Sequence, residues 1–132
     1  MIVLDTHVLV WWVANDSQLS ARARKALAAE QRRSGQILVS AITAWEIAML
    51  IRKGRLQLTM ELHDWLAAVE SLEAVRLVDV SARLAVQSVQ LPGEFHNDPA
   101  DRMIVALARE TGAPLLTADD KIHSYPHVRS IW

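Results

Sequence analysis

Four acidic residues of the chain stand where chemistry could be carried out: two directly after apolar runs and two inside helical patterns. Asp5 follows the apolar run Ile2–Leu4, and Asp119 follows the run 114–117. Carboxylates gathered in one place repel one another, so their pKa values rise unless a cation is present. Oxygen ligands without clustered histidine or cysteine select a hard ion such as Mg²⁺ or Mn²⁺. Such an ion supports phosphodiester hydrolysis.

The other two acids are Glu46 and Asp101, each within a predicted helix. Asp98 is a typical N-cap, Pro99 fits the first helical position, and Gly112 ends that helix. Asp101 lies one turn inside it, on the same face as Asp98, because residues three apart are neighbours on a helix. The helix dipole alone would also favour an acid at this position. Glu46 stands in a strongly apolar run, where a surface residue is not expected.

Three of these assignments have competing interpretations. Glu46 could form a capping box with Thr43. Asp98 is most simply a cap, with an outer-shell role at a metal site as the alternative. Asp120 competes with Asp119 for the position after the strand, because strand ends are uncertain by a residue or more.

The elements that must position these acids alternate along the chain. Apolar runs predict short buried strands, and helical patterns between them have Ser40, Thr59 and Ser81 as N-caps. The predicted strands are 2–4, 37–39, 75–80 and 114–117, with 128–132 as a further edge strand. This alternation predicts an α/β fold with a mainly parallel sheet of four or five strands, covered by helices on both faces. Asp5 and Asp119 would then project from the carboxyl edge, where open α/β sheets place their sites.

Length and composition limit the alternatives. The 132 residues, 52% of them hydrophobic, predict a single domain over 1–132. The absence of cysteine excludes disulfides, thiolate zinc sites and cysteine nucleophiles, and suits a reducing cytoplasm. The first residues, MIVLDTHVLVWWV, have no leading positive region and predict an opening strand rather than a signal peptide. No apolar run approaches the length of a membrane span, so no membrane association is expected.

Positive charge is local rather than general. With 14 Lys and Arg against 15 acids, the formal net charge is -1, which gives no broad basic field for a polyanion. The densest positive cluster is Arg52, Lys53 and Arg55, which could follow a phosphate backbone or could be a solvated helix end. Arg102 could contact RNA or pair with a carboxylate, and a salt bridge is the simpler expectation. His96, His123 and His127 lack ligand spacing and are predicted to be surface or packing residues.

Four segments of the chain resemble a known family, the PIN-domain ribonucleases, and among them the VapC-type toxins of toxin–antitoxin pairs. The segments are IVLDTHVLVWW, VSAITAWEIAML, DPADRMIVALA and PLLTADDKI. Together they span nearly the whole chain in the order expected for the family.

The resemblance implies a three-layer α/β/α PIN-like domain and a Mg²⁺- or Mn²⁺-dependent endoribonuclease. It also implies the toxin component of a type II pair, an RNA substrate, inhibition by a cognate VapB-like antitoxin, a homodimer and a cytoplasmic location. Carried over by position, the catalytic and metal-binding acids are Asp5, Glu46, Asp101 and Asp119. Thr6 and Thr117 would support them by hydrogen bonds. His7 departs from the small polar residue common at its position.

Two other classes of function remain as alternatives. The first is a catalytically silent PIN-like module that binds RNA or protein, and the complete acid set argues against it. The second is a phosphoaspartyl protein in which Asp5 is the nucleophile. That class usually places a second Asp where this chain has His7, and it leaves Glu46 unexplained.

Overall fold

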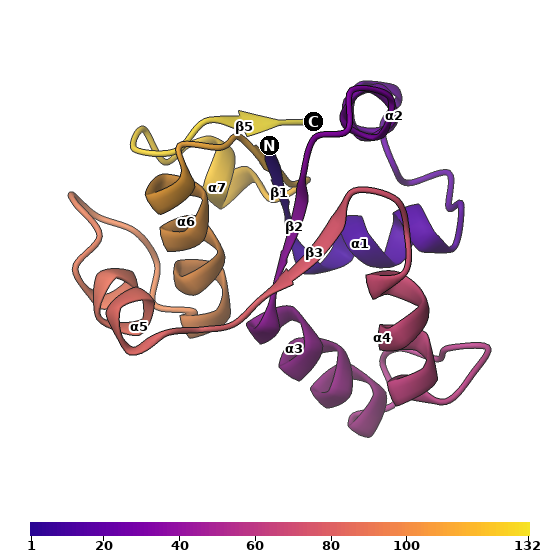
Figure 1. The fold of residues 1–132 in the computed structure, drawn as a ribbon. Helices are drawn as coiled ribbons and strands as arrows, with labels where there is room; N and C mark the ends of the chain where they lie inside the picture. The colour runs from indigo at the N-terminus through magenta and orange to yellow at the C-terminus, as the bar shows by residue number, and fades with distance from the viewer.

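The computed structural model describes residues 1–132 and is built on a five-stranded sheet in which every pairing is parallel (Figure 1). The strand order is β3-β2-β1-β4-β5, so the opening strand is central. The strands are β1 (Ile2–Leu4), β2 (Ile37–Ser40), β3 (Val75–Val78), β4 (Leu115–Leu116) and β5 (Ser130–Ile131). The predicted mainly parallel sheet is confirmed, including its edge strand near the C-terminus.

Seven helices connect and cover these strands. They are α1 (Thr6–Val13), α2 (Ala21–Arg32), α3 (Ala41–Arg52), α4 (Leu62–Glu70), α5 (Ala82–Val89), α6 (Pro99–Thr111) and α7 (Asp120–His123). Figure 1 shows α5, α6 and α7 on one side of the sheet, and α1, α2 and α4 on the other. None of these helices has the length and apolarity required to cross a membrane.

The layers follow from side-chain alternation along short buried strands. In β1, Ile2 and Leu4 belong to the apolar core shared with α1 to α4, whereas Val3 belongs to the core shared with α5 to α7. Successive side chains of a strand point to opposite faces, so one short strand supplies both cores. β2 does the same with Val39 and Leu38. The three-layer α/β/α fold is therefore confirmed.

The helix caps explain where most helices begin and end. Asp98 caps α6 by accepting a hydrogen bond from the backbone N–H of Asp101 at 2.9 Å, Pro99 is the first helical residue, and Gly112 ends the helix at φ 67°. These assignments are confirmed. The predicted Thr59 cap is wrong, because the Glu61 carboxylate accepts hydrogen bonds from the backbone of α4 at 2.8 and 3.2 Å and starts that helix instead.

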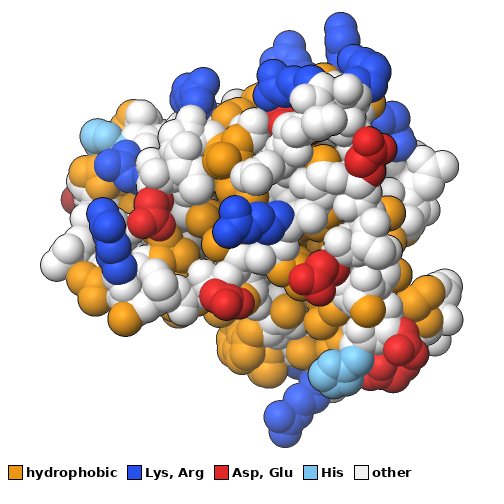
Figure 2. Space-filling view, viewed as in Figure 1, with side chains coloured by type: hydrophobic (Ala, Val, Ile, Leu, Met, Phe, Trp, Pro, Cys, Tyr) orange, Lys and Arg blue, Asp and Glu red, His pale blue; other side chains and the backbone are white.

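One group of basic side chains lies over α2, and the others are spread over the surface (Figure 2). Figure 2 shows Lys and Arg side chains concentrated over α2. The basic residues of α2 and its C-cap are all exposed and form a solvated face: Arg22, Arg24, Lys25, Arg32 and Arg33.

Candidate active site

Asp5 lies at the junction between the central strand and the first helix. It follows β1 directly and caps α1, and only 8% of its surface is exposed. The Thr6 backbone N–H donates to one carboxylate oxygen at 2.9 Å, and the Thr117 hydroxyl donates to the other at 2.6 Å. Burial raises the pKa of Asp5 above its ordinary value, although these hydrogen bonds act against the rise.

Glu46 reaches the same edge from the middle of α3. The Thr6 hydroxyl donates to its carboxylate at 2.5 Å and lies 3.0 Å from the Thr43 hydroxyl. Because a hydroxyl has one proton to donate, Thr43 is the donor to Thr6. The capping-box interpretation of Thr43 and Glu46 is wrong, since Ser40 caps α3. Burial raises the pKa of Glu46, and repulsion from Asp5 and Asp98 adds to the rise.

Asp101, in the first turn of α6, shows most directly that the acids converge. Burial, followed by repulsion from Asp5, Asp98, Glu46 and Asp119, raises its pKa to about 7. Its carboxylate lies within 4.8 Å of ligand atoms of Asp119 in one group of side chains, and of Glu46 and Asp98 in another. Residues far apart in sequence are therefore gathered at the carboxyl edge of the sheet.

Asp119 follows β4 and caps α7. Its backbone N–H donates to the Thr117 hydroxyl at 3.0 Å, and one of its carboxylate oxygens accepts from the Lys121 backbone at 2.9 Å. Thr117 thus connects Asp119 to Asp5 through one side chain. The neighbouring Asp120 is an exposed residue of α7, so the geometry favours Asp119 as the site acid.

Two groups of side chains at this edge have ligand atoms within 4.8 Å of one another. One contains His96, Asp101 and Asp119, and the other contains Glu46, Asp98 and Asp101. Asp101 belongs to both. No Lys or Arg forms an ion pair with Asp5, Glu46, Asp98, Asp101 or Asp119. The carboxylates are close together and lack an internal cation, which is the donor set that a hard divalent ion requires.

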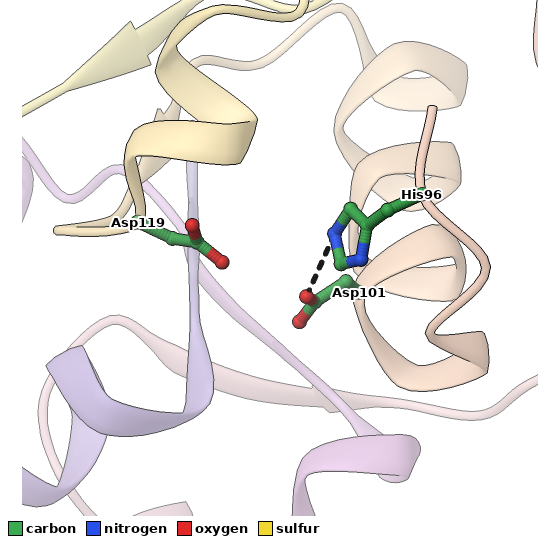
Figure 3. A group of neighbouring side chains, drawn as sticks. All are labelled: His96, Asp101 and Asp119. Carbon is green, nitrogen blue, oxygen red and sulfur yellow. Dashed lines mark ion pairs between the residues drawn. The ribbon is translucent and has the colours of Figure 1, made fainter. Parts of the chain in front are cut away.

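His96 is the site residue that sequence reasoning missed. Its Nε2 lies 3.1 Å from the Asp101 carboxylate, and Figure 3 shows the imidazole beside the carboxylates of Asp101 and Asp119. The imidazole packs against Phe95, in line with the prediction of a packing residue, but it also lies beside the acids, which the sequence did not predict. The residue comes from the irregular segment between α5 and α6, which has no periodicity to interpret. Its place two residues before the Asp98 cap is the only signal that could have identified it.

Arg102 has a different role from the one predicted. Its guanidinium donates to the backbone carbonyls of Ser88 at 2.8 Å, Phe95 at 2.9 Å, and Val89 and His96 at 3.2 Å. The expected salt bridge is wrong, and the group is committed to this segment rather than free for RNA. Arg102 therefore holds the segment that carries His96.

The second basic candidate lies at the far end of α3. Arg52, Lys53 and Arg55 are exposed and form no ion pair. Arg52 is six residues beyond Glu46, a rise of about 9 Å along the helix axis. The cluster is thus separate from the acids but on the same element as one of them.

Comparison with known proteins agrees with the fold. The PIN domain family matches residues 2–128. Ribonuclease VapC22 of Mycobacterium tuberculosis is 36% identical over 130 residues, covering 98% of this chain and 95% of that protein.

Solved structures show the same architecture at lower identity. VapBC2 from Rickettsia felis, bound to a DNA fragment from its promoter, has a TM-score of 0.70 at 19% identity, covering 99% of this chain and 98% of that one. Mycobacterium tuberculosis VapC20, a sarcin-ricin loop cleaving toxin, has a TM-score of 0.63 at 20% identity, covering 98% and 99%. The family match and the VapC22 relative show that this chain belongs to the PIN domain family, in its VapC-type branch.

Proposed function

We propose that the chain is a metal-dependent endoribonuclease and the toxin of a type II toxin–antitoxin pair. The observation that carries the proposal is the convergence of Asp5, Glu46, Asp101 and Asp119, none of which forms an ion pair with Lys or Arg, at the carboxyl edge of a parallel sheet. The VapC22 relative is named a ribonuclease, which supports RNA as the substrate.

Asp5, Glu46, Asp101 and Asp119 would hold Mg²⁺ or Mn²⁺, with Asp98 in a supporting position. The fit rests on ligand atoms within 4.8 Å of one another in two groups that share Asp101, one with Glu46 and Asp98 and the other with Asp119. Asp5 belongs to neither group, but it lies close enough to repel Glu46 and Asp101, and Thr117 connects it to Asp119. Burial raises the pKa values of Asp5, Glu46 and Asp101. When bound, an ion of this kind polarises a phosphate oxygen and lowers the pKa of a water molecule.

The chain itself orients the acids and favours a phosphate. Thr117 fixes Asp5, and Thr6 fixes Glu46, by hydrogen bonds of 2.6 and 2.5 Å. These bonds hold carboxylate oxygens in place before substrate arrives, which reduces the reorganisation needed during reaction. The N-termini of α1, α3 and α6 lie at this edge, and their partial positive charge favours the anionic backbone of RNA.

RNA contacts outside the acids fit the exposed cluster of Arg52, Lys53 and Arg55. The net charge of -1 means that affinity for RNA must come from such a local patch and from the bound ion. Replacing Lys53 and Arg55 by glutamine should weaken RNA binding and reduce its salt dependence.

A VapB-like antitoxin is the partner that the related complexes support. Structures similar in fold to this chain include VapBC from Salmonella typhimurium bound to DNA and a toxin–antitoxin complex from Klebsiella pneumoniae. A homodimer of this chain is part of the proposal. Size-exclusion chromatography with light scattering, with and without the co-expressed product of a neighbouring gene, measures both assemblies.

Cleavage by the purified protein tests the proposal. RNA fragment ends should form with Mn²⁺ or Mg²⁺, and should not form with excess chelator or with Asp5→Asn. Asp16→Asn, which changes an acid outside the site, is the matched control and should cleave normally. RNA cleavage that continues in excess chelator would contradict the metal mechanism.

The catalytically silent module gives the opposite pattern. It would bind RNA or protein without producing new RNA ends, and growth arrest on expression would persist in Asp5→Asn. The complete acid set favours the nuclease.

A further inference from the structure

The segment that joins α5 to α6 holds His96 rigidly beside the acids. Arg102 binds the backbone carbonyls of Phe95 and His96 at 2.9 and 3.2 Å. The Phe95 ring packs against His96 and Tyr125 with centroid distances of 4.4 and 4.7 Å. The Tyr125 hydroxyl donates to the Pro92 carbonyl at 2.5 Å and so holds the end of the segment that follows α5. The imidazole is therefore set in place by contacts on both sides.

The Nε2 atom of His96 has no hydrogen-bond partner although it is buried. It lies 3.1 Å from the Asp101 carboxylate, but the directional requirements of a hydrogen bond are not met. A buried polar atom without a hydrogen bond destabilises the fold. Each such atom in a native protein needs an explanation, and coordination to a metal ion is one of them.

The spacing of the three ligand atoms is close to that of the ligands of a shared cation. Adjacent ligands of an octahedral ion with bonds of about 2.1 Å lie roughly 3 Å apart, and opposite ligands roughly 4.2 Å apart. The Nε2–carboxylate distance is 3.1 Å, and the ligand atoms of His96, Asp101 and Asp119 all lie within 4.8 Å of one another. Figure 3 shows the imidazole and both carboxylates turned toward a common space.

We propose that His96 is a metal ligand together with Asp101 and Asp119, and that it makes the site prefer Mn²⁺ to Mg²⁺. The inference rests on the proposed function, because it concerns the same metal site. Imidazole nitrogen is a good ligand for transition ions, whereas Mg²⁺ takes oxygen ligands almost exclusively. A further carboxylate in place of His96 would bind both ions alike, but an imidazole distinguishes them.

Pulsed electron paramagnetic resonance of the Mn²⁺-loaded protein directly detects a bond between Mn²⁺ and the His96 nitrogen. Wild-type protein should show coupling from a directly bound histidine nitrogen, and isotopic labelling of histidine should change the signal. His96→Gln should lose the coupling. His7→Gln and His63→Gln are the controls and should keep it. His7 is near Asp5 but belongs to neither group of ligand atoms, and His63 is exposed on α4.

Affinity measured by calorimetry gives the second readout. His96→Gln should weaken Mn²⁺ binding by about tenfold or more and Mg²⁺ binding by less than about threefold. Circular dichroism checks that the variant folds, and the isotope experiment on wild-type protein needs no variant.

Three results would overturn the inference. Mn²⁺ could bind without nitrogen coupling, the coupling could persist in His96→Gln, or the variant could weaken both ions equally, as expected if His96 only orients Asp101. In these cases the proposed nuclease function stands. A wild-type protein that binds neither ion would refute the metal mechanism as well, so the two failures are distinguishable.

Discussion

Carboxylates are buried at both ends of the sheet, but only the one at the amino end has positively charged partners within the chain. At the amino end, Glu30 of α2 is only 2% exposed, and both of its oxygens lie 3.1 Å from the Met1 ammonium. Arg33 also donates to it, and the backbone N–H of Gln36 donates at 3.2 Å. At the carboxyl end, Asp101 and its neighbours have no Lys or Arg partner.

The pKa values reflect this difference. Burial acts to raise the pKa of Glu30, but hydrogen bonds and attraction from Met1 and Arg33 outweigh burial and hold it below its ordinary value. Burial and mutual repulsion raise the pKa of Asp101 to about 7. Burial alone therefore does not identify a functional acid. What distinguishes the two ends is whether the chain supplies the neutralising cation.

Even the backbone at the amino end is adapted to Glu30. A Cβ at Gly35 would lie 1.9 Å from a Glu30 carboxylate oxygen, so a larger residue at this position would displace the carboxylate. Glu30 thus completes a closed structural ion pair, whereas the acids at the carboxyl end form a set that is complete only with an external ion.

The largest expected effect is on the rate of RNA cleavage, which should depend on the acids at the carboxyl end of the sheet and not on Glu30 at the amino end. Asp119→Asn should reduce RNA cleavage by at least about a hundredfold, since a charged group acting on the reaction is removed. Initial rates on a labelled RNA at saturating Mn²⁺ measure this. Glu30→Gln should leave the rate per folded molecule within about twofold of wild type. The adjacent Asp120→Asn is the control, and a loss in that variant equal to the loss in Asp119→Asn would undermine the distinction.

The second effect is on the free energy of unfolding, and here the acid at the amino end of the sheet is the one whose replacement matters. Glu30→Gln should lower the free energy of unfolding by about 2–3 kcal/mol, because it leaves Met1 and Arg33 without their shared partner. Denaturant titration measures the change. Glu70→Gln, at an exposed position of α4, should change stability by less than about 0.5 kcal/mol. An unchanged midpoint for Glu30→Gln would mean that the amino-end ion pair contributes nothing.

The third effect is a gain in the stability of the metal-free protein when one acid of the site is replaced. Asp101→Asn should stabilise the metal-free protein by about 1–2 kcal/mol, because it removes one member of a set of repelling acids. The same variant should lose most of the stabilisation that Mn²⁺ gives to wild type. Thermal unfolding with and without Mn²⁺ measures both quantities. If the metal-free variant is less stable than wild type, the acids at the carboxyl end do not repel one another as described.

The fourth effect is the pH dependence of the metal-free protein. The raised pKa of Asp101 favours the protonated form in the fold, so its contribution to stability is present below the unfolded pKa, near 3.8, and is lost as the pH rises to about 7. The lowered pKa of Glu30 acts oppositely: its contribution is present above about 4.5 and is lost at lower pH.

The unfolding free energy of metal-free wild type should therefore fall between about pH 5 and 7, by up to roughly 1 kcal/mol per pH unit. Asp101→Asn should flatten this decline, and Glu30→Gln should flatten the acid limb instead. Denaturant titrations across this range measure both slopes. Identical pH profiles for the two variants would remove the contrast between the ends of the sheet.

Much of the fold could be predicted because its signals are local. The cap at Asp98, the first helical proline at Pro99 and the left-handed Gly112 act within one helical turn, and all three were predicted from the sequence. The start of α4 was missed because Thr59 and Glu61 both lie before the helix, and only the structure shows which side chain reaches its backbone. The parallel sheet followed from strands alternating with helices.

The candidate site was predictable where it depends on topology. Asp5 and Asp119 follow neighbouring parallel strands, so the sheet alone brings them to one edge. His96 depends instead on an irregular segment that Arg102 fixes through backbone carbonyls, and such contacts leave no pattern in the sequence. The lowered pKa of Glu30 was equally hidden, because its partners are contributed by the chain terminus and by Arg33 on the same helix.

Proton release on metal binding tests the central claim most directly. If Mn²⁺ neutralises the acids at the carboxyl end, binding at about pH 6 should release about one proton per chain, because Asp101 must lose its proton to become a ligand. Calorimetry in buffers of different ionisation enthalpy measures this number, and Asp101→Asn should release close to none. Mn²⁺ binding without proton release in wild type, or equal release in Asp101→Asn, would contradict the account.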